Sequence, residues 1–197
     1  MTESEEALRL FVACELPESV KDGLARIQEE LRAQGAGRLR WARPEGVHLT
    51  MKFLGSVAPA MAERIREGLS ERIREPFALK LRLDRVGSFG GQRVRVVWVG
   101  LAGDVEALAA LAEQVEEAIE PLGFPREKRG FAPHLTLARV PDEAGMAERS
   151  RLTALVDGFR IAESPSMTLT AVSLMRSYLL PGGARYERLA SFPPTRS

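Results

Sequence analysis

The sequence contains few of the residues that support disulfide, redox and metal chemistry. Cysteine occurs once in 197 residues, as Cys14, and histidine occurs twice. A single cysteine excludes an internal disulfide and a cysteine-based zinc site. Because Cys14 ends the apolar run 10–14, we expect it to be a buried core thiol.

An excess of charge and long apolar runs are also absent. The formal net charge is +1, from 28 basic and 27 acidic residues. Proteins that clamp long duplexes carry a strong basic excess, so any nucleic-acid contact is expected to be short, such as a terminus. No apolar run approaches membrane-spanning length, and the acidic residues 1–6 lack a signal-peptide core. These features predict a cytoplasmic protein with no membrane contact, and no obligate protein partner is evident.

The patterning of apolar residues predicts a mixed α+β chain. Apolar residues at helical spacing predict helices over 17–34, 58–75, 104–122 and 146–157. Apolar runs and alternation predict strands over 8–16, 47–54, 77–83, 94–99, 134–140, 166–175 and 185–190. The glycine cluster 87–91 predicts a hairpin turn, and 100–103 is the expected join between halves. The order of elements predicts one domain over 1–197 with two related antiparallel-sheet lobes, flanking helices and approximate halves 1–100 and 101–197.

The two histidines open the same tripeptide. His48 and His134 each begin the sequence His-Leu-Thr, and the second copy lies a little under half the chain after the first. Threonine is scarce, at seven residues in 197, so a chance repeat is a poor explanation. The repeat predicts two equivalent strands that meet at a shared site.

The residue types in the repeat suit acid–base chemistry on a phosphodiester. Side chains alternate along a strand, so His48 and Thr50 share one face, as do His134 and Thr136. A neutral imidazole can deprotonate a nucleophile, a protonated one can protonate the leaving oxygen, and threonine hydroxyls can bind non-bridging oxygens. The residues alone do not say which histidine is the acid.

A metal site is the main alternative for two histidines. They could share one ion with a carboxylate from elsewhere in the chain. However, catalytic zinc usually has three protein ligands, and neither tripeptide contains a carboxylate. We therefore expect neither a metal nor another cofactor.

Segments outside the tripeptides extend the pattern along most of the chain. They are residues 9–13, 15–17, 41–44, 48–55, 94–100, 131–139, 177–179 and 183–187. Together they resemble the two-histidine phosphoesterase superfamily, whose signature is a duplicated His-x-Thr/Ser-x. Within it, the chain is similar to the bacterial and archaeal RNA 2′,3′-cyclic phosphodiesterases, originally named 2′-5′ RNA ligases.

The resemblance implies a bilobal fold whose two motifs face a central cleft. It implies hydrolysis of an RNA-terminal 2′,3′-cyclic phosphate to a 2′-phosphomonoester, with His48 as proton donor and His134 as proton acceptor. RNA 3′ ends or small cyclic-phosphate nucleotides would be the substrates. Ligation of 2′-5′ RNA on the same site stays open, as does a non-catalytic module that binds nucleotides or RNA ends. Intact His and Thr in both motifs favour an enzyme.

Three further residues are candidates for substrate contacts. Arg139 lies five positions after His134, as in the family, and could contact phosphate or stack on a base. Strict alternation places Arg139 on the opposite face from His134, so a bulge or strand end must redirect it. Strict alternation likewise places Phe53 on the face opposite to His48, and an aromatic residue in a strand is typical of a core. Lys52 shares the His48 face by parity, which predicts an outer phosphate contact.

Overall fold

The computed structural model describes residues 6–193 except residues 37, 129 and 182. The acidic N-terminal segment therefore lies outside the described residues, apart from Glu6. The helices are α1 (Glu18–Ala33), α2 (Pro59–Arg72), α3 (Val105–Ile119) and α4 (Met146–Gly158). The strands are β1 (Leu8–Glu15), β2 (Arg40–Trp41), β3 (His48–Val57), β4 (Leu79–Phe89), β5 (Val96–Gly103), β6 (His134–Arg139), β7 (Ser166–Leu169), β8 (Val172–Leu180) and β9 (Gly183–Phe192). Within the described ranges, no helix is long and apolar enough to cross a membrane.

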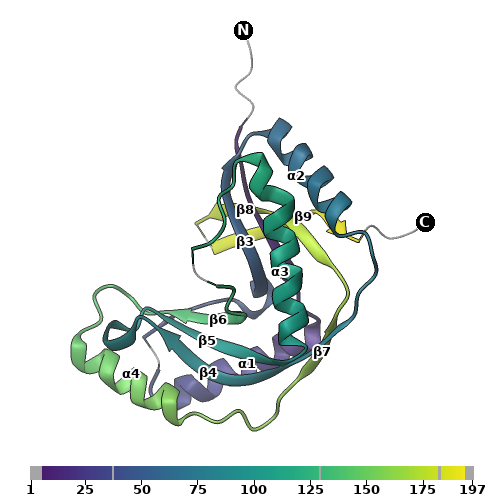
Figure 1. The fold of residues 1–197 in the computed structure, drawn as a ribbon. Coiled ribbons are helices and arrows are strands. Elements are labelled where there is room, and N and C mark those ends of the chain that lie inside the picture. The colour runs from purple at the N-terminus through teal and green to yellow at the C-terminus, as the bar shows by residue number, and fades with distance from the viewer. Residues whose placement is uncertain (1–5, 37, 129, 182, 194–197) are drawn as a thin grey trace.

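The strands form two antiparallel sheets, which confirms the predicted α+β class. One sheet has the order β3-β1-β8-β9, and the other has the order β2-β6-β5-β4-β7. In Figure 1 the four-stranded sheet lies above the five-stranded sheet. Each sheet takes strands from both halves of the chain, so residues 1–100 and 101–197 do not form separate lobes.

Two long helices cross from one lobe to the other. Helix α1 follows β1 of the four-stranded sheet but packs behind the five-stranded sheet in the view of Figure 1. There Gln28 Nε2 donates hydrogen bonds to the carbonyl oxygens of Ala42 at 2.9 Å and Leu137 at 3.1 Å. Helix α3 follows β5 of the five-stranded sheet but packs on the four-stranded sheet, where Glu116 pairs with Lys52 of β3. This reciprocal exchange ties the lobes together.

Apolar residues at helical spacing supply the core between sheets and helices. Leu24 and Leu31 of α1 and Leu108 and Val115 of α3 are fully buried in one continuous cluster. Cys14 is also fully buried, which confirms the predicted core thiol. Burial, with a smaller effect of the neighbouring Glu15 carboxylate, raises the pKa of the Cys14 thiol to about 12.

Three expectations need correction. The predicted strand 166–175 is two strands in different sheets, because β7 pairs with β4 and β8 pairs with β1. The sequence did mark this break: the buried positions are odd-numbered in Met167 and Leu169 and even-numbered in Val172 and Leu174. The turn predicted over 87–91 begins later, because β4 continues to Phe89. The expected join at 100–103 is likewise the end of β5.

Candidate active site

The two tripeptides lie on strands β3 and β6, and each strand contains a bulge at the same place. In the β3–β1 pairing, Thr50 faces Ala13 and Lys52 faces Val12, so Met51 is the extra residue. In the β6–β5 pairing the extra residue is Leu137. Both are the fourth residue of His-Leu-Thr-x. The bulges therefore belong to the repeated motif, and they reverse the alternation beyond it.

The bulges bring two predicted residues to the histidine face. Phe53 and Arg139 each lie five residues after a motif histidine. In a regular strand this odd spacing would place them on the face opposite to the histidine. With one extra residue, both return to the face of the histidine and threonine. Phe53 is 65% exposed, so the expectation that it packs in a core is wrong. A bulge that can redirect Arg139, one of the two features expected to do so, is present at Leu137.

The same bulge moves Lys52 away from the site. Its side chain is buried, pairs with the Glu116 carboxylate and donates a hydrogen bond to the carbonyl oxygen of Pro125 at 2.7 Å. The prediction of an outer phosphate contact at Lys52 is therefore wrong. It assumed regular alternation through Met51, whereas the bulge turns Lys52 toward α3.

The two imidazoles are held in the same way. His48 Nδ1 lies 2.9 Å from the carbonyl oxygen of Gly46, and His134 Nδ1 lies 2.8 Å from that of Ala132. Each partner is two residues before its histidine. Because a carbonyl oxygen only accepts, each Nδ1 must carry the hydrogen. The Nε2 atom of a neutral ring is then left with its lone pair free for proton transfer.

The surroundings of His48 are closed and aromatic. The Phe11 ring stacks on the imidazole at a centroid distance of 4.6 Å, and Tyr186 meets it edge-on at 4.9 Å. Burial lowers the pKa of His48 below 6.5, although the Gly46 carbonyl and the Glu15 carboxylate act in the opposite direction. Glu15 is the register partner of His48 and accepts hydrogen bonds from Ser173 and Arg188.

The surroundings of His134 are different. Phe89 meets this imidazole edge-on at 4.9 Å, and the Trp98 indole lies 6.5 Å away between ring centroids. Neither ring stacks on it. His134 thus shares the backbone anchor of His48 but not its aromatic stack.

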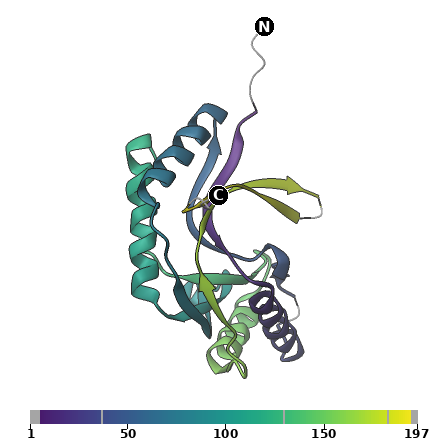
Figure 2. The same cartoon turned by 90° about the vertical axis from the view of Figure 1, so that its right-hand side faces the viewer.

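A cavity of about 380 Å³ joins most of the predicted site residues. It is lined by His48, Thr50, Phe53, Thr136 and Arg139. The β8–β9 hairpin, which projects from the body of the molecule in Figure 2, supplies Tyr186 and other lining residues. His134 lines a neighbouring cavity of about 530 Å³. His134 and Thr136 share one face of β6, so neighbouring side chains of that strand line the two cavities.

Several residues of the site carried no readable signal in the sequence. The anchors at Gly46 and Ala132 act through backbone carbonyls, which any residue provides. Phe11 lies in an apolar run that reads as core, and only its pairing opposite Phe53 places it on the cleft face. Among the described residues, no group of three or more His, Cys, Asp or Glu side chains is arranged to hold a metal ion.

The fold and the candidate site together define a class of protein by how the two motif strands are arranged. Two interlocked antiparallel sheets each contribute one strand with histidine and threonine on the cleft face and a backbone-anchored imidazole. This is the arrangement that the resemblance to two-histidine phosphoesterases implied.

The chain belongs to the 2′-5′ RNA ligase superfamily, whose family model matches residues 15–179. It is 34% identical over 188 residues to a protein of Methanothermobacter thermautotrophicus named RNA 2′,3′-cyclic phosphodiesterase, covering 94% of this chain and 98% of that protein. An Escherichia coli K12 protein of the same name is 31% identical over 191 residues, covering 97% of this chain and 99% of that protein.

Solved structures agree with this membership. Escherichia coli LigT complexed with 3′-AMP matches with a TM-score of 0.74 and 28% identity, covering 97% of this chain and 100% of that one. The protein TT0787 of Thermus thermophilus matches with a TM-score of 0.74 and 26% identity, covering 94% and 97% of the two chains. The MHV ns2 PDE domain, at 12% identity and a TM-score of 0.54, shares the fold alone.

Proposed function

We propose that this protein hydrolyses terminal 2′,3′-cyclic phosphates of RNA, or of small nucleotides, to 2′-phosphomonoesters. The observation that carries the proposal is the matched pair of imidazoles. Each is anchored through Nδ1 to a carbonyl two residues earlier and lies beside a threonine on the cleft face. The names of the relatives, RNA 2′,3′-cyclic phosphodiesterase, support this choice of substrate.

The two histidines take opposite roles in the proposed reaction. Neutral His134 accepts a proton at Nε2 from the attacking water, and protonated His48 donates one to the departing 3′-oxygen. The new P–O bond forms to water while the P–O3′ bond breaks, so the phosphate stays on the 2′-oxygen. Thr50 and Thr136 donate hydrogen bonds to the non-bridging oxygens and hold the phosphorus between the rings.

Residues around the cavity supply binding for the nucleotide that carries the cyclic phosphate. Phe53 presents an exposed ring for stacking, and Arg139 lines the same cavity as a cation for a base or a phosphate. The formal net charge of +1 suits a short contact at an RNA end. The matched acid–base pair argues against a module that only binds, because binding needs no proton transfer.

The product of a cyclic mononucleotide tests the proposal. We expect 2′,3′-cyclic AMP to yield 2′-AMP, identified by phosphorus NMR. A 3′-phosphate product would overturn the assigned roles of the two histidines. Activity that is lost on exhaustive chelation and restored by one divalent ion would replace the metal-independent mechanism with a metal-dependent one.

A further inference from the structure

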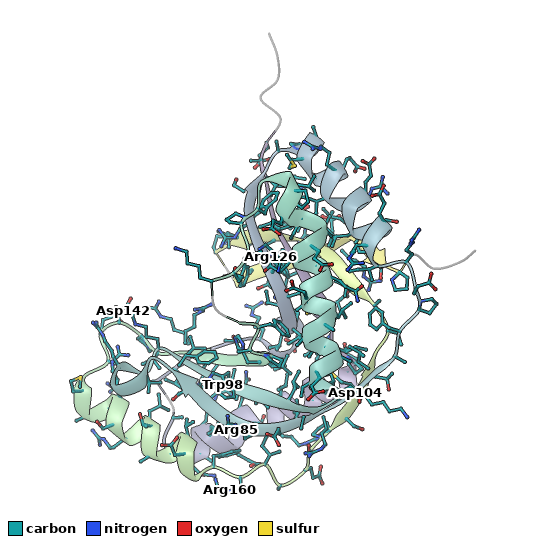
Figure 3. All side chains as sticks on the ribbon, viewed as in Figure 1. Arg85, Trp98, Asp104, Arg126, Asp142 and Arg160 are labelled. Carbon is teal, nitrogen blue, oxygen red and sulfur yellow. The ribbon has the colours of Figure 1, made fainter. Side chains whose placement is uncertain are left out.

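Two arginines lie directly opposite each other where β2 pairs with β6. Arg40 is the register partner of Arg139, so both side chains project from the same face of the five-stranded sheet. This is the cleft face, because Arg139 lines the active-site cavity together with Thr136. Figure 3 labels Trp98, the register partner of Thr136, on this sheet and Asp142, three residues after Arg139, at the end of the sheet far from α3. The arginine pair therefore lies between Thr136 and that end of the sheet.

Two like charges at this position weaken the pairing of the strands. The Cβ atoms of directly opposite residues are about 4.5–5.5 Å apart, and like charges there are destabilising. Carboxylates do little to offset the repulsion. Arg40 Nη2 lies 3.9 Å from Glu143 Oε2, and these side chains are 69% and 77% exposed. Arg139 forms no ion pair with another described residue. An anion between the two guanidinium groups would remove the repulsion.

The active-site cavity is itself positively charged. Its lining includes Arg9 and Arg139 and, among the described residues, no aspartate or glutamate. Arg9 belongs to β1 of the other sheet, whereas Arg139 lies on the strand that carries Thr136. Guanidinium groups match the geometry of phosphate oxygens and bind them through paired N–H···O bonds. The arginine pair is therefore suited to a phosphate.

The bulge at Leu137 sets the distance between this pair and the reacting phosphate. The register partners of Thr136 and Arg139 are Trp98 and Val96, so Arg139 is the next residue after Thr136 on the cleft face. Successive residues on one face of a strand are roughly 7 Å apart. In the proposed reaction Thr136 binds the cyclic phosphate, and the next phosphate of an RNA chain is one ribose away, on the 5′-oxygen of the same nucleoside. An arginine side chain at this position reaches that phosphate.

We propose that Arg40 and Arg139 together bind a phosphate on the 5′-oxygen of the nucleoside whose 2′,3′-cyclic phosphate is hydrolysed. The inference rests on the proposed function, because it places the cyclic phosphate beside Thr136. It makes the 5′-phosphate, as well as the cyclic end, part of what the site recognises. A cyclic nucleotide without a 5′-phosphate leaves the two guanidinium groups facing each other and is the poorer substrate.

Three substrates that differ at the 5′-oxygen test this proposal. They are 2′,3′-cyclic AMP, the same nucleotide with an added 5′-phosphate, and the dinucleotide ApA with a 2′,3′-cyclic end. The proteins are wild type, Arg40→Gln and the matched control Arg38→Gln. Arg38 is also exposed but lines a different cavity, of about 880 Å³, between α1 and α4. Each kcat/KM is divided by the value for 2′,3′-cyclic AMP with the same protein, so the ratio does not depend on how much protein is folded.

We expect wild type and Arg38→Gln to prefer both substrates with a 5′-phosphate at least about tenfold. This factor corresponds to ~1.4 kcal/mol, close to the lower limit for hydrogen bonds to a charged group. Arg40→Gln should lower the preference at least about threefold, a factor within the range for one exposed ion pair. A preference for both substrates identifies the phosphodiester of an RNA chain as a ligand, and a preference for the 5′-monophosphate alone identifies a small nucleotide.

Other outcomes overturn the arginine pair. They are a wild-type ratio near one, a preference that Arg40→Gln leaves intact, and a preference for the dinucleotide alone, which would show that the second nucleoside is recognised instead. Arg9→Gln tests the other lining arginine: a preference lost in Arg9→Gln but kept in Arg40→Gln would place the phosphate against β1. A wild type that hydrolyses none of the three substrates overturns the proposed function itself.

Discussion

The two histidines have the same anchor and different neighbours. His48 is stacked on Phe11 and closed in by Tyr186, whereas His134 has only edge-on and more distant rings and borders the larger cavity. In the proposed reaction, the repeated part, from the Nδ1 contact to the bulge, prepares both rings for proton transfer. The surroundings of the two rings differ. In the proposed reaction, the closed surroundings of His48 suit a departing oxygen of the bound nucleotide, and the more open surroundings of His134 admit a nucleophile.

The largest expected effect on activity tests what the two histidines share. Replacing either His48 or His134 with alanine should lower kcat/KM for a 2′,3′-cyclic mononucleotide by about 10²–10⁴-fold, the range for one general acid or base. The double variant should be little worse than either single variant, because both rings serve one transition state. Steady-state kinetics on variants with wild-type melting curves measure both quantities. Near-normal turnover by either single variant would rule out the two-histidine mechanism.

The second effect tests a difference between the motif strands. Four residues after the histidine, β3 carries Lys52, paired with Glu116, and β6 carries Ala138. The side chains of Lys52 and Glu116 are 2% and 12% exposed. Lys52→Met should therefore lower the free energy of unfolding by about 3–5 kcal/mol, because it leaves the Glu116 carboxylate buried without its partner. Urea denaturation measures the loss.

The double variant Lys52→Met/Glu116→Leu is the control for this pair. Apolar residues of similar volume often replace a buried ion pair at little cost, so most of the stability should return. A Lys52→Met protein as stable as wild type would show that the pair does not fasten α3 to β3.

The third effect compares the two threonines. Thr50→Ala and Thr136→Ala should each raise the activation free energy by about 1.5–3 kcal/mol, the range for one hydrogen bond to a charged group. Equal losses in kcat would place both hydroxyls on the same phosphate. Thr→Ser at either position keeps the hydroxyl and should recover most of the activity. Losses confined to one threonine would show that the motifs are not equivalent in catalysis.

Local patterns in the sequence predicted the parts of the molecule that depend on near neighbours. Helical spacing located α1 to α4, and the repeated tripeptide identified the two strands that carry the candidate site. The parity of Arg139 called for a bulge or a strand end to redirect it, and the structure contains a bulge at Leu137. For the helices and the repeated tripeptide the physical cause acts within one element, so it leaves a readable pattern.

Long-range pairing explains what the sequence did not reveal. The exchange of α1 and α3 between lobes depends on contacts such as Gln28 with Leu137, which no local pattern encodes. Gly87 reads as a turn residue, but its position under Trp98 follows from pairing between β4 and β5. Lys52 was misplaced for the same reason, since a bulge is defined only against the partner strand.

The smallest expected effect concerns the charge on His48. Its pKa lies below 6.5 because of burial, while Glu15 acts to raise it. Glu15→Gln should therefore lower the His48 pKa further, as measured by NMR titration of the imidazole. Glu187→Gln, which neutralises a carboxylate on β9 instead, should leave the His48 pKa unchanged. The unfolded ring binds its proton at higher pH than the folded ring, so His48 lowers stability as the pH falls below about 6.5.

This low pKa also tests the role of His48 as proton donor. The donor must be charged when the substrate is bound, yet burial favours the neutral ring in the free protein. A bound phosphate anion next to the ring should raise the His48 pKa, because an opposite charge stabilises the imidazolium. Titration in the presence of saturating 2′-AMP should therefore move its midpoint upward. As a result, the basic limb of kcat should lie at higher pH than that of kcat/KM, although these limbs report the coupled pair. A midpoint that 2′-AMP leaves in place would contradict the donor assignment and favour His48 as the base.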